Sequence, residues 1–184
     1  RNWGPRVDPG LYLTYFDGVA RPLLVVKDNI DGFFRTGVNT TNSLIIDKMV
    51  RKTGLRVTYT DMRDKDLIPK THMSRNTLNL RANTNITKYV DLDFKVTYTH
   101  ENVHNRPAVA DHRANIAKNL MTLSTTFDQA WLRDNYQDAN GEYYNWNDGD
   151  RYNINPYWVL NKMSNDTKKD TYRGSAVIRY RPFK

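Results

Sequence analysis

A regular alternation of apolar and polar residues in the middle of the chain constrains the fold more than any other feature. The cleanest stretch places Val90, Leu92, Phe94, Val96 and Tyr98 against Asp91, Asp93, Lys95, Thr97 and Thr99. Successive side chains of a β-strand point to opposite faces, so this pattern predicts a strand with one apolar and one wet face. Residues 55–60 and 77–86 alternate in the same way, and residues 172–183 do so less cleanly. The pattern therefore predicts an all-β fold.

The connections between these strands differ greatly in length. Residues 87–89 make a tight turn, and residues 61–74, which contain Pro69, make a medium loop. About 65 to 70 residues separate the third and fourth strands, and a segment far beyond the usual loop length is expected to be functional. Tight turns at one end, long loops at the other and strands of about ten residues are typical of outer-membrane barrels.

A soluble β-sandwich is the alternative, because one polar face suits either bulk solvent or a wet barrel lumen. Sandwich strands are usually shorter, about five or six residues, which favours the barrel. Four or five strands cannot close a barrel, and an open sheet edge in lipid would leave amide groups unpaired. We therefore expect these strands to be part of a larger wall, and the initial Arg1 indicates that the sequence does not begin at a native start.

Composition and motifs argue against several other classes. The 184 residues include no cysteine, so there is no disulfide, thiolate metal site or cysteine nucleophile. The net charge of +8 is spread along the chain, and we predict no nucleic-acid partner. No catalytic motif is present, so we predict no enzymatic activity and no cofactor. Residues 138–150 resemble calcium loops only superficially, because the order of their glycines and acidic residues does not match an EF-hand.

Outside the strands, the sequence predicts irregular chain with short elements. Residues 1–40 carry turn signals, with a short buried strand at 23–26 and a helical turn at 29–34, and another short strand is expected at 43–47. Within the long segment, Asp111 is expected to cap a helix that runs to about Ser124. The helical spacing of Ile116, Leu120 and Leu123 motivates this prediction.

Aromatic residues are concentrated in the second half of the long segment. Rings on a polar loop can stack on sugars, meet another protein or form the hydrophobic core of the loop itself. The candidates for contact with a substrate or partner are Trp131, Tyr143, Tyr144, Trp146, Tyr157 and Trp158.

A set of short motifs, in order along nearly the whole chain, resembles SusC/RagA-type TonB-linked outer-membrane proteins of Bacteroidota. The motifs are Trp3–Asp8, Asp28–Gly37, Thr41-Asn42, Leu67–Pro69, Arg75–Leu78, Asn105–Pro107 and Asn155–Asn161. The chain departs from the family where Ser43 to Arg51 replaces a Ser/Gly-rich strand followed by a Gly-Gly turn. The resemblance covers the junction of plug and barrel and the strands that follow it.

The resemblance implies part of a large antiparallel transmembrane β-barrel, 22-stranded in that family. Residues 1–40 would be the end of the plug and its junction, 41–103 the first barrel strands, 104–170 a long extracellular loop with a short helix, and 171–184 the next strand. It further implies an outer-membrane importer of glycans or peptides. The implied partners are a SusD-like surface lipoprotein, outer-membrane lipid, and TonB through a missing N-terminal part.

Overall fold

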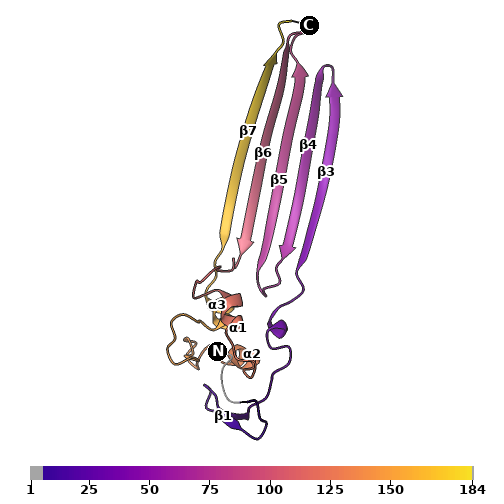
Figure 1. The fold of residues 1–184 in the computed structure, drawn as a ribbon. Helices are drawn as coiled ribbons and strands as arrows, with labels where there is room; N and C mark the ends of the chain where they lie inside the picture. Colours follow the sequence, from indigo (N-terminus) through magenta and orange to yellow (C-terminus); the bar gives the residue numbers. More distant parts are fainter. Residues whose placement is uncertain (1–5, 184) are drawn as a thin grey trace. The chain divides into compact units, whose positions relative to one another are not determined.

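The computed structural model describes residues 6–183, so Trp3 to Pro5 of the first motif and Lys184 lie outside the described residues. The described chain is mostly antiparallel β-sheet with a few short helices (Figure 1). It divides into two compact units. We call residues 38–65, 72–104 and 166–183 the strand unit, and residues 6–37, 66–71 and 105–165 the helical unit.

The strand unit is one open sheet of five antiparallel strands in chain order (Figure 1). The strands are β3 (Val38–Val50), β4 (Thr53–Lys65), β5 (His72–Asn85), β6 (Val90–His104) and β7 (Thr167–Tyr180). Each has 13 to 15 residues. β3 and β7 each have one neighbour in this sheet, so both are edge strands.

The strands extend beyond the alternating segments that predicted them. β4 and β5 remain paired from Asp61↔Asn76 to Lys65↔His72, so the loop between them is residues 66–71 and the predicted loop 61–74 is wrong. The predicted short strand at 43–47 is the middle of the longer β3. The extensions are mostly polar, with Met62, Met73 and Val103 as isolated apolar residues, so no regular alternation of apolar and polar residues marks them.

The fourth predicted strand is displaced along the chain. β7 begins at Thr167 and ends at Tyr180, whereas the sequence predicted 172–183. Polar residues before 172 pair with the end of β6, as in Asp170↔His100. Pro182 has no backbone N–H for a sheet hydrogen bond.

Two tight turns join neighbouring strands. The β3–β4 hairpin closes at Arg51-Lys52, directly after the pair Val50↔Thr53. Arg51 has φ 53°, the left-handed conformation that two-residue hairpins require. The β5–β6 turn occupies residues 86–89, one residue more than the predicted 87–89, and Ile86 N donates to Val90 O at 2.9 Å.

The helical unit contains a two-stranded ribbon and four short helices. They are β1 (Tyr12–Thr14), β2 (Ala20–Pro22), the 3-10 helix η1 (Asp31–Phe33), α1 (Ile116–Met121), α2 (Gln129–Asp134) and α3 (Pro156–Lys162). The predicted helical turn at 29–34 is confirmed as η1. The predicted strand at 23–26 is wrong: the segment is irregular, Leu23 is buried, and Leu24 and Val25 are exposed. No strand pairs with this segment in the described sheets.

The predicted helix from Asp111 to Ser124 is shorter than expected. Helix α1 has six residues and its N-cap is Asn115, whose side chain accepts a hydrogen bond from Lys118 N at 3.2 Å. Asp111 instead forms an ion pair with Lys118 Nζ at 3.2 Å. Residues 111–114 form turns, with Asn115 N donating to His112 O at 2.9 Å, so the helix begins only after Asn115.

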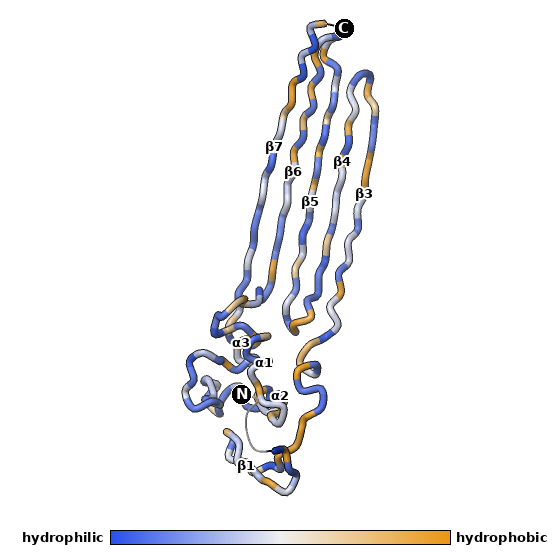
Figure 2. The backbone as a smooth tube through the Cα atoms, in the orientation of Figure 1, coloured by the Kyte–Doolittle hydropathy of each residue, from blue (hydrophilic) through white to orange (hydrophobic). Residues whose placement is uncertain are grey.

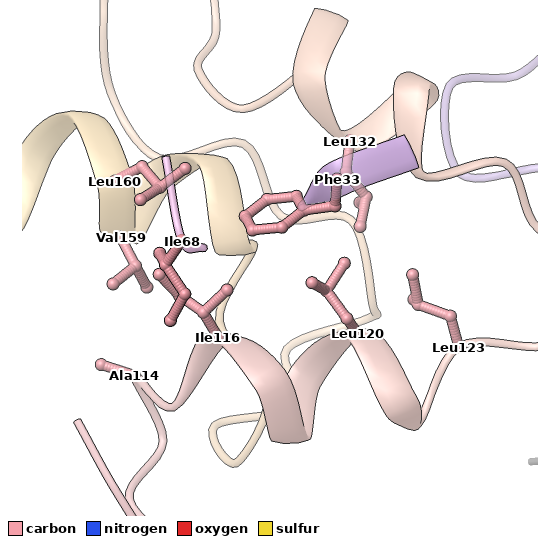
Figure 3. Packing of buried hydrophobic residues seen from close by; sticks show 9 residues of the cluster. All are labelled: Phe33, Ile68, Ala114, Ile116, Leu120, Leu123, Leu132, Val159 and Leu160. Carbon is pink, nitrogen blue, oxygen red and sulfur yellow. The ribbon is translucent and has the colours of Figure 1, made fainter. Parts of the chain in front are cut away.

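Apolar residues from all four helices form one core in the helical unit. Figure 3 shows Phe33 of η1, Ile116 and Leu120 of α1, Leu132 of α2 and Val159 and Leu160 of α3 converging, with Ile68 beside them. Leu120 and Leu132 are both 0% exposed. Among the described residues, no helix combines the length and the apolar character needed to span a membrane.

Candidate functional site

The five-stranded sheet has two chemically different faces. Residues directly opposite each other on antiparallel strands share a face, and faces alternate along each strand. The register Val57↔Leu80, Leu80↔Val96 and Val96↔Gly174 therefore places these residues on one face. Figure 2 shows hydropathy changing repeatedly along each strand. The grouping of residues predicted from alternation is confirmed.

We call the part of this face nearer the tight turns the apolar band. Its members are Leu44, Ile46, Lys48 and Val50 of β3; Thr53, Leu55, Val57 and Tyr59 of β4; Leu78, Leu80, Ala82 and Thr84 of β5; Val90, Leu92, Phe94, Val96 and Tyr98 of β6; and Tyr172, Gly174, Ala176, Ile178 and Tyr180 of β7. Lys48 is the only charged member, two residues before β3 ends. A side chain of that length can carry its ammonium away from an apolar surface.

The apolar band is exposed and is bordered by tyrosines. Leu44 is 61% exposed and Ile178 is 70% exposed, although a soluble monomer rarely leaves so large an apolar surface uncovered. Tyr59, Tyr98 and Tyr172 lie in one row across the sheet, and the rings of Tyr98 and Tyr172 stack with centroids 4.9 Å apart. Tyr180 lies at the other end of the band, opposite Val90.

The length of the apolar band can be compared with the apolar band of outer-membrane barrels. At about 3.3 Å per residue, the strand from Val90 to Tyr98 covers about 26 Å. A tilt of about 40° would reduce this to about 20 Å, close to the apolar band of about 25 Å in outer-membrane barrels.

The opposite face of the sheet is polar and is connected by charged pairs. Arg56 and Asp47 pair at 2.6 Å, and Arg81 and Asp93 pair at 2.5 Å, each across neighbouring strands. Asn79 accepts a hydrogen bond from Thr97 at 2.7 Å. The predicted wet-face residues Asn79, Arg81, Asn83, Asp93 and Lys95 all lie on this face. Alongside the apolar band, every strand therefore carries charged side chains on this face, whereas Lys48 is the only charged residue within the band itself.

Two histidine–aspartate contacts lie on the same side of the sheet as the apolar band, beyond the tyrosine row. His100 Nδ1 lies 2.8 Å from Asp170, and His104 Nδ1 lies 2.8 Å from Asp166. The sequence showed no carboxylate partner for these histidines, because each partner is on the far side of the long connection and only the strand register brings the two together.

In the helical unit, the six predicted aromatic residues are all partly buried. Trp131 packs on Tyr15 with ring centroids 4.5 Å apart, and Tyr144 and Trp146 pack on Phe16. Four of the six rings thus contact residues of the chain before residue 38, and the remaining two contact each other. Those contacts are Trp131–Tyr15, Tyr144–Phe16, Trp146–Phe16, Tyr157–Phe33 and Tyr143–Trp158. The rings thus pack partly within the long segment, as on Phe127, and partly on residues before 38, which the self-packing alternative did not include. Contact with a ligand stays a prediction.

The ion pair between Arg21 and Asp17, in the ribbon of β1 and β2, lies beside the ring of Trp131. The two terminal guanidinium nitrogens of Arg21, Nη1 and Nη2, donate to the Asp17 carboxylate at 2.7 and 2.5 Å. The central carbon of the guanidinium lies 4.3 Å from the Trp131 ring centroid. The hydrogen bonds from Arg21 hold the pKa of Asp17 below its ordinary value.

The hydroxyls of Tyr143 and Tyr157 form hydrogen bonds to other residues of the helical unit. The Tyr143 hydroxyl accepts a hydrogen bond from Asn155 N at 3.2 Å, and the Tyr157 hydroxyl bonds to the Gln129 side chain. Burial raises the pKa of both tyrosines, so both hydroxyls stay protonated near neutral pH. Asn155 is itself fully buried and caps α3.

Tyr143 and Trp158 also line an open cavity of about 430 Å³ within the helical unit. Arg113, Asn147 and Arg151 also line this cavity. This volume falls in the range of about 300–1,000 Å³ usual for small-ligand sites. The sequence analysis did not identify the two arginines, because they are far apart in the chain and neither belongs to a motif.

The segments that resemble calcium loops are turns. Asp138 Oδ1 accepts from the backbone N–H groups of Asn140 and Glu142, each at 2.9 Å, and Asp150 accepts from Tyr152 N at 2.8 Å. In residues 6–183, no three His, Cys, Asp or Glu side chains are grouped to hold a metal ion.

Comparison with known proteins identifies no relative: no model of a protein family matches the chain, and a search of curated proteins finds no match.

Proposed function

We propose that the strand unit forms part of the wall of an outer-membrane β-barrel, and that the protein imports glycans or peptides in the manner of SusC/RagA-type TonB-linked proteins. The observation that carries the proposal is the contrast between the two faces of the sheet. The apolar band would contact lipid acyl chains, and the polar face with Arg81 and Asp93 would line a wet interior. A charged side chain facing lipid at the midplane costs about 2–4 kcal/mol, so this orientation is strongly preferred over its reverse.

The edge strands support a wall of more than five strands. The outer edges of β3 and β7 have no partner strand in this sheet. Unpaired amide groups of an edge cannot remain in lipid. In this proposal, further strands outside this sequence would pair with both edges and close the barrel.

The alternative is a soluble sugar-binding or adhesive β-sandwich. A sandwich covers the apolar face of one sheet with a second sheet. The described residues contain only one other sheet, the ribbon of β1 and β2, whose strands have three residues each. This ribbon is too small to cover the apolar band, which favours the membrane proposal.

In this proposal the helical unit would lie outside the bilayer, where its aromatic rings or its cavity could meet substrate or a SusD-like lipoprotein. Residues 105–165 contribute three short helices and no strand of the large sheet, which supports an excursion from the wall rather than a membrane crossing.

Two measurements on the full-length protein carrying this sequence test the proposal. The first is extraction of cell membranes with alkaline carbonate: we expect the protein to stay in the outer-membrane fraction. The second is uptake of oligosaccharides or peptides by cells before and after the proton-motive force is collapsed, and we expect uptake to stop. Recovery of the protein as a water-soluble species, or uptake that continues after collapse, would contradict the proposal.

A further inference from the structure

The cavity beside Tyr143 and Trp158 combines two kinds of chemistry. The two aromatic side chains offer apolar ring surface, with the edge of one against the other at a centroid distance of 5.3 Å. Arg113 and Arg151 add positive charge to the lining of the same cavity. Sites for small ligands typically pair apolar surface with a few placed polar groups, and this cavity has that composition.

Both arginines are exposed and available. Within residues 6–183, neither guanidinium forms an ion pair or a hydrogen bond. Most other arginines of the helical unit already have partners. Arg21 forms an ion pair with Asp17, and Arg133 forms one with Asp134. Arg35 donates hydrogen bonds to backbone carbonyl groups. A free guanidinium presents a planar fork of donors that matches a carboxylate.

The one carboxylate on the cavity wall does not neutralise the arginines. Asp150 Oδ1 accepts from Tyr152 N at 2.8 Å, and Asp150 Oδ2 accepts from Asn153 Nδ2 at 2.8 Å. These hydrogen bonds hold the pKa of Asp150 below its ordinary value, so it stays charged while engaged with its own turn. The cavity lining therefore has two positive charges, on Arg113 and Arg151, and one negative charge, on Asp150, whose oxygens are already hydrogen-bonded.

Asn147 adds an unused acceptor next to the cavity. Its Nδ2 donates to Asn153 O at 2.7 Å, but its Oδ1 is buried and has no hydrogen-bond partner among the described residues. Buried polar atoms in folded proteins nearly always have a partner. A water or a ligand hydroxyl that reaches this atom would satisfy it.

We propose that this cavity binds an oligosaccharide that carries carboxylates, such as a chain of uronic acids. Arg113 and Arg151 would hold sugar carboxylates, and Tyr143 and Trp158 would pack against the apolar face of a sugar ring. Amide groups such as that of Asn147 would meet hydroxyls. The choice of a saccharide rests on the proposed import function, whereas the preference for negative charge rests on the cavity alone.

The test uses calorimetry and tryptophan fluorescence on the purified full-length protein, with three probes. The probes are trigalacturonate, its fully methyl-esterified form and triglutamate. We expect trigalacturonate to bind at least about tenfold more tightly than the ester, which has the same rings without the charges. Its affinity should also fall as salt is added.

A double variant and a matched control localise the binding. Arg113→Gln with Arg151→Gln should weaken trigalacturonate binding at least about tenfold. Arg133→Gln, which removes an exposed arginine of the same unit outside the cavity, should leave it unchanged. Circular dichroism and thermal unfolding of all variants check that the fold is retained.

The proposal is overturned if trigalacturonate does not bind at millimolar concentration, if the ester binds equally well, or if the double variant binds like the wild type. Equal or tighter binding of triglutamate would contradict the assignment to a saccharide. Carbonate extraction of the same cells separates the two proposals. Outer-membrane protein without uronate binding defeats only the cavity assignment, and uronate binding by a soluble protein defeats only the importer.

Discussion

The strand unit and the helical unit differ in whether their apolar side chains are exposed or buried. The helical unit buries Leu120 and Leu132 completely inside its own core, whereas the sheet leaves Leu44 and Ile178 more than half exposed. A unit with its own core can obtain its stability from internal packing. A sheet with an exposed apolar face obtains it only when something apolar covers that face. The two units should therefore respond differently to mutation and to their surroundings.

The largest expected effect is loss of a core side chain in the helical unit. Leu120→Ala should lower the free energy of unfolding by about 2–5 kcal/mol, because it removes buried methyl groups and leaves a cavity. Met121→Ala on the same helix is the control: Met121 is 71% exposed, and the change should stay within about 0.5 kcal/mol. Denaturant unfolding followed by tryptophan fluorescence measures both. Equal effects would show that the helical unit is not packed around this core.

A charge in the apolar band should have the next largest effect, and only in a bilayer. Val96→Arg should cost about 2–4 kcal/mol in lipid vesicles, because the guanidinium would face acyl chains. Thr97→Arg, one residue along β6 and on the polar face, should cost much less. Unfolding of the two vesicle-embedded variants compares them. If Thr97→Arg were the more damaging change, the orientation of the sheet would be reversed.

Removal of one buried amide should have an intermediate effect on the helical unit. Asn155 is 0% exposed, its Oδ1 accepts from Tyr157 N at 2.9 Å, and its Nδ2 donates to Leu132 O at 2.9 Å. Asn155→Ala should cost about 1–3 kcal/mol, because it removes a helix cap and leaves a buried carbonyl unpaired. The exposed Asn161, on the same helix, supplies the control Asn161→Ala. Thermal unfolding should separate the two variants clearly.

The smallest expected effect is a pH dependence from the Asp17–Arg21 pair. Because the folded-state pKa of Asp17 is lowered, its stabilisation is present above the unfolded-state value of about 3.9 and is lost as pH falls through the folded-state value. The free energy of unfolding of the wild type should therefore exceed that of Asp17→Asn by about 1 kcal/mol or less at pH 6. Denaturant unfolding at several pH values should show this difference shrinking toward pH 3. A difference that grows on acidification would contradict this account of the pair.

The sequence predicted the middle of the sheet well and its ends poorly. Between Val90 and Tyr98 the alternation is complete, and the residues fall on the predicted faces. Toward His104, and between Asp61 and Lys65, apolar residues are too few to alternate, so no periodic signal marks the strand although pairing continues. Strand length is decided there by hydrogen bonding to the neighbouring strand, which a single segment does not reveal.

In the helical unit, the helices are too short to be predicted reliably from the spacing of their apolar residues. Helices α2 and α3 have six and seven residues, too few to produce a clear helical period. Asn155-Pro156 is nonetheless a readable start signal, an N-cap followed by proline in the first turn. The aromatic residues were predicted as one group that contacts a ligand or partner or packs within the loop. The structure shows four of them packed on rings before residue 38 and two packed on each other. Arg113 and Arg151 meet at the cavity only through the folding of the whole unit.

The most direct test of the contrast between the two units uses a fluorescent label on two adjacent residues of β6. The sequence has no cysteine, so Phe94→Cys and Lys95→Cys can each carry a single environment-sensitive dye within this segment of the full-length protein. In lipid vesicles, we predict that a doxyl-labelled lipid quenches the dye at position 94 strongly and the dye at position 95 weakly. Equal quenching at both positions, or stronger quenching at 95, would contradict a sheet whose apolar band faces the bilayer.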